Sequence, residues 1–219
     1  FTPLMPMATF ENGKLIWLPI EGVAYYQVIR NGQVWKTTSA TSIAVSNAEK
    51  GEFQVVAVAK SGLSSFAGEP VQIYPTADIK TVEIEKVLSP SSLPYRNFSG
   101  AGFVEISKTV NPVISFDIDV ATEGLYAIDW RYANGNGPIN TENKCAIRTL
   151  FVDTNPLGAQ VFPHRGTNEW SIWGFSNAVQ VRLRAGKHTL KLAFMPENEN
   201  MNIEINQAML DYVRLIKID

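Results

Sequence analysis

The chain has 219 residues, of which 45% are hydrophobic and 18% charged, and its net charge is −2 at pH 7. This charge excludes an electrostatic basis for binding nucleic acid or an anionic membrane surface. The apolar runs are far shorter than the ~20 residues that span a bilayer, so no membrane insertion is expected. A single cysteine, Cys145, excludes an internal disulfide.

Short alternating apolar runs, bounded by Gly, Pro, Asn or Ser, predict an antiparallel β-sandwich for residues 1–76. An Asn31-Gly32 hairpin turn separates two of its strands. The strands are predicted at 14–19, 25–30, 33–36, 42–45 and 51–59. This succession resembles a fibronectin type III domain over about residues 10–74. Trp17 matches the early core Trp of that family, whereas Phe53 stands where the family often has a corner Tyr.

The stretch 74–78 (Tyr-Pro-Thr-Ala-Asp) is predicted to be a linker, because Pro cannot donate a ladder hydrogen bond and the alternation lapses there. Residues 79–219 form the second predicted domain. Its strands are expected at 81–87, 103–106, 113–120, 124–132, 146–152, 173–183, 188–194 and 210–216. Strands without a helical pattern predict a jelly roll, so the expected fold class is all-β, with two β-sandwich domains.

The sequence does not support catalysis. His188 begins an alternating strand after a Gly turn, where a side chain bonded within the hairpin is favoured over a ligand. His164 has no Cys or His at metal-ligand spacing, which argues against zinc. Cys145 lies in no nucleophile motif, and the predicted state is a buried thiol. Carboxylates are numerous, but no glycosidase pair is set off by its context.

Three segments together resemble the β-sandwich carbohydrate-binding modules of families six and thirty-five. They are Gly124-Leu-Tyr-Ala-Ile-Asp-Trp-Arg-Tyr-Ala-Asn134, the Trp-rich loop at 167–173, and the turn and strand at 185–192. The resemblance covers about 140 residues. It implies a jelly roll with a sugar site in the loops at one end, as found in the tails of glycoside hydrolases.

A calcium site is expected near the two ends of the second domain. Glu83 and Glu85, two residues apart on a predicted strand, share a face, and a hard divalent cation would relieve their repulsion. Asp211 heads the last strand. The resemblance implies that these three share a structural calcium, with backbone carbonyls from the loop after Ile106. The alternative is that Glu83 and Glu85 form a solvated strand face.

The resemblance also implies a sugar site made of an aromatic ring and amide groups. Asn134 matches an amide of the family and Trp170 matches its aromatic residue. Asn136 is a further expected contact, and Tyr95 and Phe98, from an earlier loop, are candidates for a second wall. Core packing is the alternative for Trp170, and a turn role is the alternative for Asn134, which begins an Asn-Gly-Asn-Gly run.

One position departs from the family pattern. Met209 stands where those modules usually have an Asn, and a thioether does not usefully hydrogen-bond a hydroxyl. The third polar contact is therefore expected from Asn202, Asn206 or Gln207.

These observations predict a non-catalytic, carbohydrate-binding C-terminal part of a larger secreted glycan-degrading enzyme. Its expected partners are a polysaccharide or oligosaccharide and the catalytic domain of the same polypeptide, and its expected location is extracellular, at the cell surface or periplasmic. The alternative is a pair of structural accessory domains that pack against that catalytic domain without binding sugar. Catalysis by the chain itself would need two facing carboxylates in a cleft.

Overall fold

The computed structural model describes residues 2–135, 145–166, 168–199 and 206–219, and these divide into two compact units, Phe1–Ala77 and Asp78–Asp219. Regular structure in the described residues consists of β-strands and short 3₁₀ helices, so the predicted all-β class is confirmed. The helices are η1 (Asn47–Glu49), η2 (Thr76–Asp78), η3 (Ile84–Lys86) and η4 (Pro196–Asn198). None of the helices in the described ranges has the length and apolarity needed to cross a membrane.

The first unit is a sandwich of two antiparallel sheets. One has the order β1-β2-β5 and the other β4-β3-β6-β7. Asn31 and Gly32 join β3 to β4 with φ angles of 49° and 78°, as a two-residue hairpin turn requires. The strands are β1 (Ala8–Glu11), β2 (Lys14–Trp17), β3 (Val23–Arg30), β4 (Gln33–Thr38), β5 (Ser42–Ala44), β6 (Gly51–Ala59) and β7 (Val71–Ile73).

The core of the first unit is built on alternating residues of these strands. Trp17 is buried and contacts Tyr26 edge-on, with ring centroids 5.3 Å apart. Phe53, fully buried, packs against Trp35. The Tyr26 hydroxyl accepts a hydrogen bond from the Ile20 N–H at 3.0 Å, so a tyrosine of β3 makes the hydroxyl-to-backbone bond that Phe53 cannot make.

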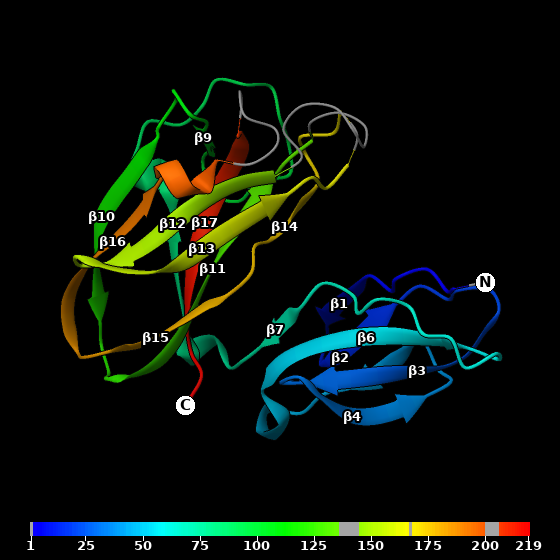
Figure 1. Cartoon of the computed structure of the whole chain (residues 1–219). Helices are drawn as coiled ribbons and strands as arrows, with labels where there is room; N and C mark the ends of the chain where they lie inside the picture. The colour runs from blue at the N-terminus through cyan, green and yellow to red at the C-terminus, as the bar shows by residue number, and fades with distance from the viewer. Residues whose placement is uncertain (1, 136–144, 167, 200–205) are drawn as a thin grey trace. The chain divides into compact units, whose positions relative to one another are not determined.

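The second unit is also a two-sheet sandwich (Figure 1). One sheet has the order β10-β16-β12-β13, and the other has β14-β11-β17-β8, with β15 paired to β11 and β9 paired to β17. Its strands are β8 (Ile79–Glu83), β9 (Val104–Ile106), β10 (Val113–Val120), β11 (Gly124–Ala133), β12 (Cys145–Val152), β13 (Asn155–Pro163), β14 (Trp173–Phe175), β15 (Val179–Leu183), β16 (Gly186–Ala193) and β17 (Ala208–Lys217).

Strand β11 shows how the sequence assigns residues to the two faces of its sheet. Tyr126, Ile128, Trp130 and Tyr132 alternate along it and belong to the main core between the sheets. Arg131 lies on the opposite face. The register between β11 and β17 shifts after Arg131, which makes a β-bulge at the start of β17.

Two predicted strands were wrongly bounded in the second unit, and one strand was missed. The strand predicted at 81–87 ends at Glu83 and continues as η3, and the strand predicted at 173–183 is two strands, β14 and β15. Strand β13 was not predicted, because Pro156 and Gly158 interrupt its pattern. Its place at the edge of the sheet explains how Pro156 is tolerated there.

Candidate functional site

An aromatic cluster lies at one end of the second unit, on the face of the β11–β17 sheet that is turned away from the main core. Phe103, Ala133 and Met209 are its buried base, at no more than 1% exposure. Half-buried side chains from two loops and from the first residue of β14 cover this base, namely Leu93, Tyr95, Phe98, Trp170 and Trp173. Met209 is therefore the apolar floor of the cluster.

Three of these rings form a continuous stack. The centroids of Phe103 and Tyr95 are 5.8 Å apart at 27°, and those of Tyr95 and Trp170 are 5.7 Å apart at 12°. Tyr95 is thus sandwiched, and Trp170 is the outermost ring. The Tyr95–Trp170 spacing leaves no room for a sugar ring between them, because carbon atoms in contact on each side need ~3.5–4 Å. A ligand that stacks on Trp170 would therefore have to use the side of the indole away from Tyr95.

Hydrogen bonds tie the two covering loops together. The Trp173 Nε1–H donates to the Arg96 carbonyl at 2.6 Å, and the Arg96 N–H donates to the Ser171 hydroxyl at 3.0 Å. Backbone groups of Arg96, in the Tyr95 loop, therefore hold the side chains of Ser171 and Trp173, which follow Trp170 in the sequence.

Asn134 is not placed as predicted. Its side chain is fully buried, and its Nδ2 donates to the Phe162 carbonyl at 3.0 Å. A buried amide is normally satisfied internally, and this one joins β11 to β13. Next to it, a Cβ on Gly135 would lie 2.2 Å from the Glu169 carbonyl carbon, so only glycine allows this close approach to the Trp170 loop.

Asn206 also differs from the prediction. It is 1% exposed, its Oδ1 accepts from the Ile147 N–H at 2.9 Å and from Arg148, and its Nδ2 donates to the Asn198 carbonyl. This amide holds the start of β12 and the buried Arg148 in place, and it does not face a ligand. The predicted contacts Asn136 and Asn202 lie outside the described residues.

The three predicted metal ligands surround one short turn. The Ser99 hydroxyl lies 2.9 Å from Glu83 Oε2 and 3.0 Å from Asp211 Oδ1, while the Ser99 N–H donates to both Asp211 oxygens. The Ala101 N–H donates to Glu85 Oε1 at 3.0 Å. Sequence reasoning did not find this turn. Its signal is Gly100, with φ +59°, where a Cβ would lie 2.3 Å from Glu85 Oε1.

The charge of this acid cluster is only partly balanced. Asp211 is fully buried and forms an ion pair with Arg131, whose Nη2 also donates to the Asn97 carbonyl at 3.1 Å. Burial, reinforced by the charges of Glu85 and Asp211, raises the pKa of Glu83, although its hydrogen bond from Ser99 lowers it.

The residues of the acid cluster suit a calcium ion in their chemistry. All three offer hard carboxylate oxygens, and the buried Oε2 of Glu85 has no hydrogen-bond partner among the described residues. Within the described ranges, however, no three Asp, Glu, His or Cys side chains are close enough together to hold a metal as they stand. Asp211 accepts from Ser99 and pairs with Arg131, so it would have to exchange one of these contacts to join Glu83 and Glu85 around a cation.

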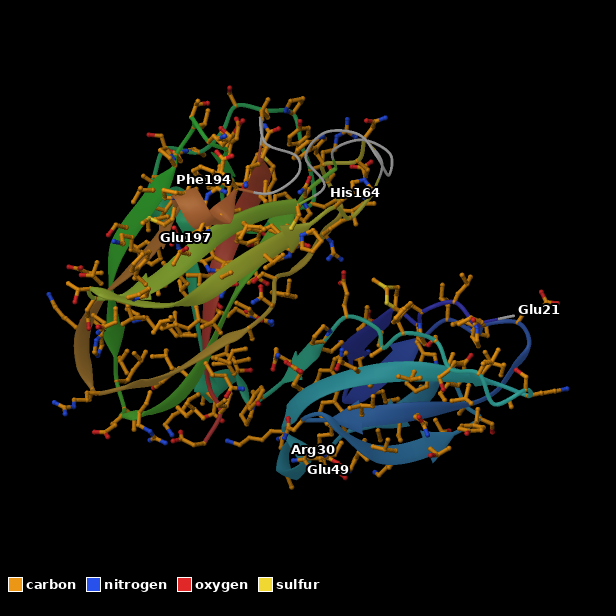
Figure 2. The ribbon with its side chains drawn as sticks, viewed as in Figure 1. Glu21, Arg30, Glu49, His164, Phe194 and Glu197 are labelled. Atoms are coloured by element: carbon orange, nitrogen blue, oxygen red, sulfur yellow. The ribbon has the colours of Figure 1, made fainter. Side chains whose placement is uncertain are left out.

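Cys145, His164 and His188 belong to neither the aromatic cluster nor the acid cluster. Burial raises the pKa of Cys145, which is half-buried and stays a thiol near neutral pH. His164, labelled in Figure 2, is half-buried, and no residue that the structure describes forms a hydrogen bond with its Nε2. His188 accepts or donates at both ring nitrogens, to Asp153 and to the carbonyl of Arg184 within its own hairpin.

No protein-family model matches the chain. It is similar to a cycloisomaltooligosaccharide glucanotransferase from Niallia circulans, with 32% identity over 104 residues, or 48% of this chain and 10% of that protein. A 1,6-alpha-glucosyltransferase from Sporosarcina globispora is 28% identical over 108 residues, or 49% of this chain and 8% of that protein. The matched segments thus span about a tenth of these relatives.

Among solved structures, a family 35 carbohydrate-binding module from an environmental isolate has 20% identity and a TM-score of 0.48, over 62% of this chain and 91% of the module.

Proposed function

We propose that the second unit binds carbohydrate and places the ring of a sugar against the outer face of Trp170. The observation that supports this most is the three-ring stack, in which Phe103 and Tyr95 hold a half-exposed indole in a fixed orientation. A ring held in a fixed orientation loses little conformational entropy when it binds a ligand. The C–H face of a sugar is weakly polar, and it suits such a surface.

We propose a glucan with α-1,6 linkages as the ligand. This choice rests on the names of the two relatives, a cycloisomaltooligosaccharide glucanotransferase and a 1,6-alpha-glucosyltransferase. In this proposal the chain is a non-catalytic part of a larger, extracellular glycan-acting enzyme, and it raises the local concentration of the catalytic domain on its substrate. The first unit, with its three-stranded and four-stranded sheets, would be a fibronectin type III-like spacer.

Titration calorimetry of the full chain with isomaltoheptaose and with dextran tests this function. Trp170→Ala should weaken binding about tenfold, since aromatic stacking is worth ~0.5–1.5 kcal/mol and tenfold is ~1.4 kcal/mol. Ile172→Ala is the matched control, because Ile172 is 43% exposed in the same loop but offers no ring. Equal affinities for the Trp170 variant and the parent chain would contradict the proposal.

We also propose that the acid cluster binds a structural calcium ion through Glu83 and Glu85, with Asp211 as the third ligand. The support is the unpartnered Glu85 oxygen and the excess of carboxylates over guanidinium groups around Ser99. When bound, the ion would offset carboxylate repulsion and join the start of the unit to its last strand. Its role would be in stability.

A second candidate function is a structural accessory unit without a sugar ligand. The buried amides of Asn134 and Asn206 favour it, because they remove two polar contacts that the sequence led us to expect, and Met209 adds an apolar floor that offers no polar group. Absence of heat with every glucan, for a parent chain that is folded, would support this reading over the first.

A further inference from the structure

The second unit also has a cavity near the β12–β13 turn and β15. Figure 1 shows these elements at the end of the unit opposite β9 and β14. The cavity has a volume of about 390 Å³ and lies between the β12–β13 turn, strand β15 and the first residues of β16. This volume is within the range of about 300–1,000 Å³ that small-molecule sites occupy. The proposed sugar surface at Trp170 does not include any of its lining residues.

The inner wall of the cavity is apolar. Val152 and Leu183 belong to the buried core, at 4% and 2% exposure, while Leu157 and Val181 are half-buried and pack against that core. Leu157 and Val181 therefore present C–H surface to whatever fills the cavity, and a ring with an apolar face would cover it.

The rim is polar and its backbone is held in place. His188 Nδ1 lies 3.0 Å from Asp153 Oδ2, and His188 Nε2 lies 2.9 Å from the Arg184 carbonyl oxygen. The Thr189 N–H donates to Asp153 Oδ1 at 2.9 Å, and the Asp153 N–H donates to the Thr189 carbonyl. These bonds connect the two turns that flank the cavity, so the cavity is preformed.

The rim also has spare positive charge. Arg184 is exposed, and its guanidinium has no hydrogen-bond or ion-pair partner among the described residues. Among the described residues, the ion-pair partner of Arg182 is Asp219, with 3.6 Å between Nη1 and Oδ2 of two exposed side chains. Asp153 is the one carboxylate that lines the cavity, and both its oxygens are engaged by His188 and Thr189. An arginine fork without a partner suits a planar carboxylate.

We propose that this cavity is a second binding site, whose ligand is a monocarboxylate borne on a six-membered ring with an apolar face. The carboxylate would pair with Arg184, with Arg182 beside it, and the ring would lie on Leu157 and Val181. Two sources have this chemistry, a uronate sugar and an aromatic acid. The site does not depend on the proposed function of Trp170.

Amide chemical shifts of the ¹⁵N-labelled full chain test the site, with sodium glucuronate, sodium benzoate and neutral glucose as probes. At least one carboxylate should produce saturable shifts at residues 153–155, 157 and 181–184, and glucose should not. Saturation by glucuronate alone would identify a uronate site, and saturation by benzoate would identify an aromatic-acid site. No saturable shift with either acid, or equal shifts with glucose, would overturn the proposal.

Arg184→Gln should weaken this binding about tenfold, the scale of one charge-assisted pair. Arg184 is exposed and its side chain is unpartnered, so the variant should fold, and unchanged shifts elsewhere would show this. Arg96→Gln, an exposed arginine of the Trp170 end, is the control and should leave the affinity unchanged. Shifts at 181–184 that saturate identically in Arg184→Gln would also overturn the assignment.

Discussion

Calcium should stabilise the second unit, and Glu83→Gln should remove most of that effect. The Glu83 carboxylate shares the Ser99 hydroxyl with Asp211, and Glu85 has a buried oxygen without a partner, so a cation would enter between Glu83 and Glu85. At a free calcium concentration 100 times its Kd, a ligand that binds only the native state adds about 2.7 kcal/mol.

This free energy corresponds to a measurable temperature shift. With an unfolding entropy of about 2.1 cal/mol/K per residue over the roughly 140 residues of the unit, 2.7 kcal/mol raises Tm by about 9 °C. Calorimetric melting of the full chain in CaCl₂ and in EDTA measures it, and the transition of the first unit is an internal reference. Glu123→Gln, an exposed carboxylate of the same unit, is the matched control. A Tm that is the same in calcium and EDTA would refute the reasoning.

Three further predictions concern stability. Arg214→Met should lower the free energy of unfolding by about 3–5 kcal/mol, because it leaves the 1%-exposed Asp129 without its guanidinium partner at 2.6 Å. The double variant Asp129→Leu with Arg214→Met should be near neutral. Chemical denaturation measures both, and equal losses for the two variants would contradict this prediction. Asn134→Ala should cost about 1–3 kcal/mol, as a buried carbonyl of β13 loses its donor, and an unchanged midpoint would count against a structural role. The hydrogen bond to Asp153 raises the pKa of His188. The stability that this histidine contributes should therefore be complete below its unfolded pKa of about 6.5 and disappear as pH rises through its folded pKa. A His188→Gln variant whose free energy of unfolding depends on pH as that of the parent does would refute this prediction.

Local patterns in the sequence were sufficient for the β-structure. Alternation in β11 placed Tyr126, Ile128, Trp130 and Tyr132 on the core face, and the Asn31-Gly32 pair indicated a hairpin turn that the structure shows. These features depend on side-chain periodicity and on the φ preferences of two residues, which are local properties. Strand β13 was missed because Pro156 and Gly158 interrupt its alternation, and its pairing with β12 is a long-range contact that the local pattern does not show.

The sequence by itself determined which residue types lie near the candidate site, namely Trp170, Tyr95 and the three acidic side chains. Only the tertiary structure decided which of them face outward. Asn134 and Asn206 look identical to ligand-binding amides in the sequence, but their neighbours from β13 and β12 take up their hydrogen bonds and bury them. Burial and hydrogen-bond partners come from residues far apart in the chain, so a sequence motif cannot specify them.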